Sequence, residues 1–164
     1  MLELRPLSNH DIPLVEDWLN KAHVKRWYEI PRLHVSISDW MSEIEARNGA
    51  FQWITYLIVL YQGRPIGLCQ YYKCVDSDED FGELPLEGSY GIDYLIGEEA
   101  YLGKGIGKSM VSLLVSKLFS FSDVQRITAD IDPSNKSSEM TLLSCGFQLL
   151  DDERSRYVMY KQND

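Results

Sequence analysis

Three alternating glycines, at positions 103, 105 and 107, stand between a predicted strand and the longest amphipathic helix of the chain. The segment reads Leu102-Gly103-Lys104-Gly105-Ile106-Gly107-Lys108-Ser109. Glycine lets the main chain approach a bound anion closely, and the first turn of a helix carries unpaired N–H groups and partial positive charge. The segment therefore favours a diphosphate ligand; a turn that only starts a helix is the simpler alternative.

The same segment fits neither of two common nucleotide-binding motifs. A nucleoside-triphosphatase P-loop requires a glycine five residues before Gly107, where Leu102 stands. A dinucleotide-binding G-x-G-x-x-G that begins at Gly103 or Gly105 places Lys108 or Met110 where the third glycine belongs. These two classes of nucleotide-binding protein are therefore excluded.

Hydrophobic periodicity predicts one α+β domain over residues 1–164. Strands are predicted at 2–5, 51–61, 65–73, 88–96, 126–131, 147–150 and 157–161, and helices at 11–22, 39–47, 103–119 and from the turn at 132–135 to Cys145. The order gives a long antiparallel meander with one parallel crossover through the 103–119 helix. Asp76 to Glu87 holds six acidic residues together with Gly82 and Pro85, which predicts a loop.

Charge and composition restrict the partners. Lys and Arg number 16 against 25 Asp and Glu, so the net charge is −9 and a phosphate backbone is repelled, whereas a cationic partner is favoured. The longest apolar run, 56–61, is too short to cross a bilayer, and the three cysteines form no paired motif. We expect a cytoplasmic protein, monomeric or homodimeric, that binds no nucleic acid, membrane or metal.

Several segments together resemble the GNAT acetyltransferase superfamily, and within it the aminoglycoside 6'-N-acetyltransferases. They are Trp18-Leu19-Asn20 with His23 and Trp27-Tyr28; Gly63-Arg64-Pro65-Ile66-Gly67 with Gln70; Gly91-Ile92-Asp93; Leu102-Gly103-Lys104-Gly105; and Asp132-Pro133-Ser134-Asn135 with Gly146-Phe147. The resemblance covers essentially the whole chain and implies a mixed, mostly antiparallel sheet flanked by helices, with the fourth and fifth strands splayed apart. Leu102 departs from it, since Arg or Gln is usual there.

The resemblance implies that acetyl-CoA donates an acetyl group directly to a primary amine of a cationic small molecule, with an aminoglycoside as the best choice, as in antibiotic resistance. The implied cofactor-binding residues are Tyr94, Leu95, Ile96, Leu102, Gly103, Lys104, Gly105, Ile106, Gly107, Lys108, Ser109 and Asn135. The main chain of the first three pairs with the pantetheine arm, and one of their N–H groups polarises the thioester oxygen.

Asp93 is the predicted catalytic base. A charged residue is unusual inside an apolar strand, and a carboxylate can both attract an ammonium group and accept its proton. The residues expected to bind the acceptor are Trp27, Tyr28, Gln70, Asp78, Asp80, Asp93 and Asp130. Alternatives to acceptor binding remain for some of these residues. The acidic loop that contains Asp78 and Asp80 could simply be exposed to solvent, and Trp27 and Tyr28 could pack in the core at the end of a helix.

Leu142 occupies the position at which the family often has a tyrosine that protonates the departing thiolate. Leucine cannot donate a proton, so Thr141, Ser144 or water takes this role, or the thiolate leaves as an anion. Two further alternatives stay open. One is a siderophore hydroxylamine or protein N-acetyltransferase of the same fold, and the other is a non-catalytic module that binds acyl-CoA.

Overall fold

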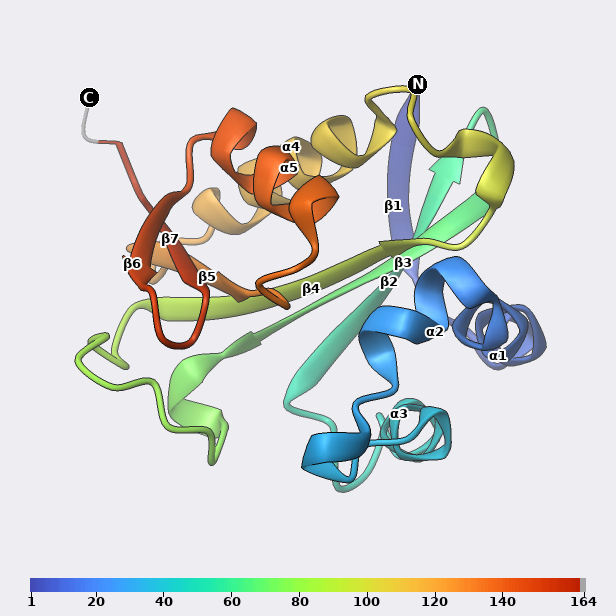
Figure 1. The fold of residues 1–164 in the computed structure, drawn as a ribbon, viewed down its shortest axis with the longest axis horizontal. Coiled ribbons are helices and arrows are strands. Elements are labelled where there is room, and N and C mark those ends of the chain that lie inside the picture. Colours follow the sequence, from blue (N-terminus) through green and yellow to red (C-terminus); the bar gives the residue numbers. More distant parts are fainter. Residues whose placement is uncertain (163–164) are drawn as a thin grey trace. The chain divides into compact units, whose positions relative to one another are not determined.

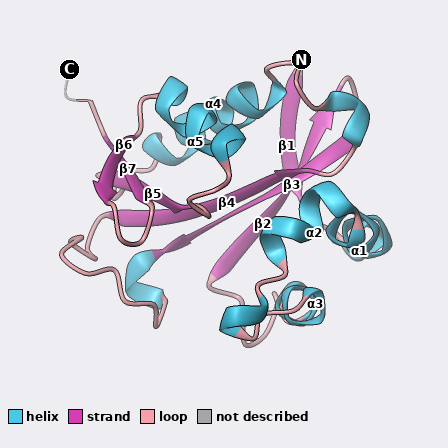
Figure 2. Cartoon of the chain, in the orientation of Figure 1, coloured by secondary structure: helices cyan, strands magenta, loops and turns pink. Residues whose placement is uncertain are grey.

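A computed structural model describes residues 1–162 (Figures 1 and 2). The strands are β1 (Leu2–Pro6), β2 (Ile54–Tyr61), β3 (Arg64–Lys73), β4 (Ser89–Ile96), β5 (Arg126–Asp130), β6 (Gln148–Asp151) and β7 (Arg156–Tyr160). The helices are α1 (Ile12–Asn20), α2 (Ala22–Tyr28), α3 (Ile37–Glu45), α4 (Ile106–Phe119) and α5 (Lys136–Cys145), besides four single 3-10 turns. The predicted mixed α+β class is confirmed.

The strands follow the order β1-β2-β3-β4-β5-β7-β6. Strand β4 runs parallel to β5, as the crossover through α4 predicts, whereas β5 with β7 and β6 with β7 are antiparallel. Pairing between β4 and β5 covers three residue pairs and stops where Gly91 faces Thr128, although β4 continues to Ile96. Pairing with β5 is thus confined to the first residues of β4.

The chain divides into two compact units, and each is built from two segments. Unit 1 comprises Met1–Gln70 and Tyr94–Lys104, and unit 2 comprises Tyr71–Asp93 and Gly105–Asp164. The boundaries fall inside β3, inside β4 and within the glycine segment, so no linker in the sequence marks them. The single-domain interpretation stays a prediction.

Unit 1 contains one more helix than the sequence predicts. The predicted helix 11–22 is wrong at its C-terminal end: α1 ends at Asn20 because Lys21 is extended (φ −72°, ψ 140°), and α2 begins at Ala22. Helix α1 buries Val15, Trp18 and Leu19 in the core of this unit. Helix α3 starts at a capping box, because the hydroxyl of Ser36 accepts a hydrogen bond from the Asp39 N–H.

Unit 2 is built around α4, which buries one apolar face. Met110, Val111, Leu114 and Leu118 are almost fully buried, as is Leu142 of the neighbouring helix α5. The two helices lie side by side in Figure 1. Helix α4 begins at Ile106 and not at the predicted Gly103, because Gly103 and Gly105 both have left-handed backbone conformations.

Candidate active site

The glycine segment forms an open turn that leads into α4. Gly103 and Gly105 have φ values of +72° and +75°, and a Cβ atom added to either would meet no atom within 4 Å. The first turn of α4 carries no acidic residue, and no side chain caps it. Its N–H groups are therefore presented without a competing negative charge, which is the arrangement that binds phosphate.

The side chains of this segment contribute less than its main chain. Ile106 is buried, and the Ser109 hydroxyl donates a hydrogen bond to the Gly105 carbonyl oxygen at 3.4 Å. Leu102 is 41% exposed, and Lys104 and Lys108 are exposed cations at either side of the turn. Among the predicted cofactor-binding residues of this segment, the two lysines provide positive charge, and the glycines leave space for a ligand to approach the main chain.

Asp93 is half-buried on β4 in unit 2. Two residues earlier and on the same face of the strand, Gly91 makes room for the phenol of Tyr72: a Cβ at Gly91 would lie 2.4 Å from Tyr72 Cζ. Burial and the Asp93 carboxylate raise the pKa of Tyr72 far above its usual value. The phenol therefore keeps its proton at physiological pH and is a neutral neighbour of the predicted base.

The main chain of the next residues of β4 is held by side chains of α2 in unit 1. The Tyr28 hydroxyl donates to the Tyr94 carbonyl oxygen at 2.8 Å, and His23 Nε2 lies 3.0 Å from the Ile96 carbonyl oxygen. The structure thus brings together two predicted residues, Tyr28 and Tyr94. His23, which sequence analysis included only in the resemblance, takes part as well.

The other predicted aromatic contact of α2 is Trp27, which is half-buried with the Arg26 guanidinium 4.7 Å from its ring centroid. Gln70, at the end of the β3 segment in unit 1, is buried. The Arg26 guanidinium thus already packs against one face of the indole. The structure leaves both acceptor-binding predictions untested.

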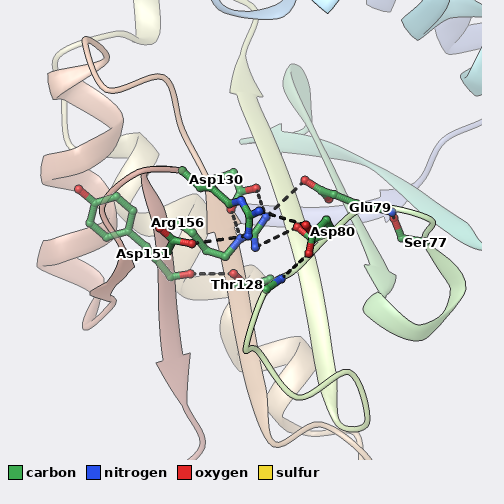
Figure 3. Close-up of polar contacts among 10 residues, drawn as sticks. Ser77, Glu79, Asp80, Thr128, Asp130, Asp151 and Arg156 are labelled. Atoms are coloured by element: carbon green, nitrogen blue, oxygen red, sulfur yellow. Dashed lines mark hydrogen bonds and ion pairs between the residues drawn. The ribbon is translucent and has the colours of Figure 1, made fainter.

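Asp130 is bound by a residue that the sequence analysis missed (Figure 3). Arg156, with a side chain 2% exposed, donates from Nε to Asp130 Oδ1 at 2.8 Å and from Nη2 to Asp130 Oδ2 at 2.9 Å. It also donates to the Asp80 carbonyl oxygen at 3.3 Å, and its guanidinium lies 5.0 Å from the Phe81 ring centroid. Glu79 Oε1 is 3.6 Å from the same guanidinium. Arg156 therefore ties the acidic loop to β5 and β7.

Asp78 and Asp80, the loop residues predicted to bind the acceptor, are both exposed. The Asp80 carboxylate accepts a hydrogen bond from the Gly82 N–H at 2.8 Å and pairs with Arg154 at 3.1 Å. The Gly82 N–H and then the Arg154 charge lower the pKa of Asp80. Asp80 is an ionised carboxylate at neutral pH, so it could attract a cation.

Burial and the neighbouring Asp130 carboxylate raise the pKa of Glu79 to about 7 from an ordinary value of 4.5. The folded protein therefore binds more protons than the unfolded chain between these values, and its stability falls as pH rises from about 4.5 to about 7. Without screening, the full pKa shift of Glu79 would change the free energy of unfolding by about 3 kcal/mol. Because the Glu79 side chain is 43% exposed and water screens its charge, we expect a change of about 1 kcal/mol.

Glu79→Gln should remove this pH-dependent loss. Relative to wild type, the variant should gain about 2–4 °C in Tm between pH 5 and pH 8, measured by thermal unfolding at both values. Glu83→Gln, in the same loop, is the control. A gain for Glu79→Gln that is the same at pH 5 and pH 8 would contradict the raised pKa.

The residues of α5 restrict the choice of a general acid. Leu142 is fully buried, the Thr141 hydroxyl donates to the Ser137 carbonyl oxygen at 2.9 Å, and the Ser144 hydroxyl donates to the Thr141 carbonyl oxygen at 3.0 Å. Both hydroxyl protons are thus directed at their own helix. The predicted cofactor-binding residue Asn135 caps α5, because its Oδ1 accepts a hydrogen bond from the Ser138 N–H at 3.2 Å.

Over residues 1–162, no cluster of three or more His, Cys, Asp or Glu side chains is arranged to hold a metal ion. None of the helices in that range has the length and apolar character needed to cross a bilayer.

An acetyltransferase is the class of protein that this fold and site match: a family model described as an Acetyltransferase (GNAT) domain covers residues 8–153. The chain therefore belongs to the GNAT acetyltransferase family and is an acyltransferase. Acetyl-CoA is the donor in this family. The resemblance inferred from the glycine segment and the shorter motifs is confirmed.

Individual relatives agree. Two proteins named aminoglycoside N(6')-acetyltransferase type 1, from Klebsiella pneumoniae and Serratia marcescens, are each 30% identical over 146 residues, which is 88% of this chain and 73% of theirs. A crystal structure of aminoglycoside acetyltransferase AAC(6')-Ib with coenzyme A has a TM-score of 0.83 at 26% identity, covering 98% of this chain and 95% of that chain. Its complex with paromomycin and acetyl-CoA gives 0.83 at 27%, covering 98% and 93%.

Proposed function

We propose that this protein transfers an acetyl group from acetyl-CoA to a primary amine of a cationic small molecule, and that the acceptor is an aminoglycoside modified at its 6'-amine. The observation that carries the proposal is the similarity to the two aminoglycoside N(6')-acetyltransferases, because it extends over 88% of the chain. The net charge of −9 supports it, since it attracts a polycationic acceptor and speeds its encounter.

The donor is proposed to bind through main-chain groups. The turn at Gly103 and Gly105 and the first turn of α4 are suited to the pyrophosphate, because both glycines leave open space where a side chain would lie. The pantetheine arm is proposed to pair with main-chain N–H groups of residues 94–96, because the Tyr94 and Ile96 carbonyl oxygens already have hydrogen-bond partners in Tyr28 and His23. Asn135 is proposed to contact the donor through the groups that its capping bond leaves available.

Asp93 is proposed as the base. An amine that is protonated at pH 7 must lose a proton before its nitrogen can attack, at a cost of about 1.4 kcal/mol per pKa unit above ambient pH. A half-buried carboxylate can attract the ammonium group and take that proton. Trp27, Tyr28, Gln70, Asp78, Asp80 and Asp130 are proposed to bind the rest of the acceptor.

The nitrogen then forms a bond to the acyl carbon while the carbon–sulfur bond breaks. As the amide forms, the nitrogen loses its second proton to water, and Asp93 releases the first proton to solvent after the transfer. Since a thiol has a pKa near 8.5, the thiolate is a tolerable leaving group, and we propose that water and not a side chain of α5 supplies the proton that converts it to the coenzyme A thiol. Buried Leu142 and the internal hydrogen bonds of Thr141 and Ser144 support this assignment.

A thiol-release assay tests the acceptor. With acetyl-CoA and kanamycin we expect release of coenzyme A and a monoacetylated product, and an aminoglycoside that carries a hydroxyl group at 6' should give neither. Hydroxylysine and a panel of peptides, tested as acceptors in the same assay, represent the siderophore hydroxylamine and protein N-acetyltransferase alternatives. Activity on these alone would reject the aminoglycoside assignment, and binding of acetyl-CoA without transfer to any amine would indicate a binding module.

We propose a cytoplasmic location. Within the described residues, no disulfide bond involves Cys69, Cys74 or Cys145, as expected in a reducing compartment.

A further inference from the structure

Helix α2 contacts the part of β4 to which the proposed function assigns the pantetheine arm. The contacts are side chain to main chain: the Tyr28 hydroxyl donates to the Tyr94 carbonyl oxygen, and His23 Nε2 lies within hydrogen-bond distance of the Ile96 carbonyl oxygen. Because a carbonyl oxygen can only accept, the second bond requires the proton of the imidazole to be on Nε2. Two side chains of one short helix thus bind alternate peptide groups of one strand.

The two carbonyl groups lie on the same edge of β4. Main-chain groups alternate between the edges of a strand, and the Gly88 carbonyl oxygen accepts a hydrogen bond from the Arg126 N–H at the start of β5. Tyr94 and Ile96 are an even number of residues from Gly88, so their carbonyl groups point to the same edge of β4. The pairing of β4 with β5 ends at Gly91, so the hydrogen bonds that a neighbouring strand would supply to these carbonyls come from α2.

The opposite edge is fixed independently. The N–H groups of Gly97 and Glu98 both donate to the Ile66 carbonyl oxygen, at 2.8 and 3.2 Å, which is the pattern of a β-bulge. A Cβ on Gly97 would lie 2.1 Å from Trp18 Cγ, so the indole of α1 closes over this residue. Residues 94–98 are therefore held from two sides, by α2 and by β3.

Helix α2 is held in place at Tyr28, the residue that donates to the Tyr94 carbonyl oxygen. Trp40 Nε1 of α3 donates to the Tyr28 carbonyl oxygen at 2.7 Å, and the two rings pack edge to face with centroids 5.0 Å apart. Lys21, directly before α2, pairs with Glu98 at 3.7 Å. The Tyr28 phenol is thereby fixed before any ligand binds, as a positioning group requires.

We infer that Tyr28 and His23 are positioning residues that set the conformation of the cofactor-binding stretch of β4 through the Tyr94 and Ile96 carbonyl groups. The inference rests on the proposed function, which assigns the pantetheine arm to residues 94–96. It gives the Tyr28 hydroxyl a role in donor binding, in addition to the acceptor contact predicted from the sequence.

Tyr28→Phe tests the inference because it removes only the hydroxyl group. We expect the Kd for acetyl-CoA, measured by calorimetry without acceptor, to rise about 3- to 10-fold, and the KM for acetyl-CoA to rise with it. The 13C′ chemical shift of Tyr94 should move as its hydrogen bond is lost. Tyr61→Phe, which removes a hydroxyl from the same unit, should change none of these quantities.

His23 provides the second arm of the experiment. His23→Ala should raise the Kd for acetyl-CoA by a similar factor, and His23→Gln, which keeps a side-chain N–H donor, should restore at least half of the loss in binding free energy. An active wild type whose Tyr28→Phe and His23→Ala variants both bind acetyl-CoA with unchanged Kd overturns the inference alone. A wild type that binds no acetyl-CoA overturns the inference and the proposed function together.

Discussion

Asp93→Asn is expected to lower kcat for acetyl transfer by about 10²- to 10⁴-fold, the usual contribution of a positioned general base. Asparagine has nearly the same shape as aspartate but accepts no proton and carries no charge. The change therefore removes both the attraction for the ammonium group and the acceptor of its proton. The Kd for acetyl-CoA should stay within about 2-fold, because the proposed donor contacts are made by main-chain groups of other residues.

Steady-state kinetics over a pH series make this prediction specific. In wild type, a base that takes the proton from the bound ammonium group should keep kcat/KM high below the pKa of the amine, whereas in Asp93→Asn the remaining rate should rise with pH as the amine loses its proton in solution. Asp17→Asn, an exposed carboxylate of α1, is the control for a general loss of negative charge. An Asp93→Asn enzyme with the kcat of wild type would remove Asp93 as the base.

The glycine segment and Asp93 stand out in the sequence because each residue type is unusual in its place. Glycines at 103 and 105 are required by left-handed backbone conformations before α4, and a lone carboxylate inside a strand needs a special environment. The parallel step from β4 to β5 was predictable for a similar reason, since a helix between two strands makes a crossover. These features depend on residues close together in the chain.

Nothing comparable in the sequence marks helix α2 or the contacts of Arg156. A helix of seven residues is too short for a clear hydrophobic period, and the break at Lys21 has no glycine or proline to mark it. Arg156 is separated from Asp130 by 26 residues and from Asp80 by 76, so its partners exist only in the fold. The excess of acidic residues in the 76–87 loop was the only hint in the sequence that a buried arginine contacts this loop, because a buried arginine needs acidic partners.

The Arg156–Asp130 pair should contribute strongly to the stability of unit 2. Arg156→Met keeps most of the side-chain volume but leaves Asp130 and Glu79 without their shared cation and releases the loop at Asp80. Breaking a buried ion pair costs about 3–5 kcal/mol. Because the Asp130 side chain is 36% exposed and water can solvate part of it, we expect a loss of about 2–4 kcal/mol, or roughly 5–15 °C in Tm.

Arg154→Met is the matched control, because Arg154 lies two residues away and pairs with Asp80 and Asp151 at 3.1 and 3.7 Å while its side chain is 39% exposed. An exposed pair of this kind contributes less than about 1 kcal/mol, so its Tm should fall by about 4 °C at most. Adding Asp130→Asn to Arg156→Met should recover about 1–2 kcal/mol, because the unpaired charge is then removed. Thermal unfolding of the four proteins measures these differences, and equal losses for Arg154→Met and Arg156→Met would show that burial of the guanidinium adds nothing to the strength of the pair.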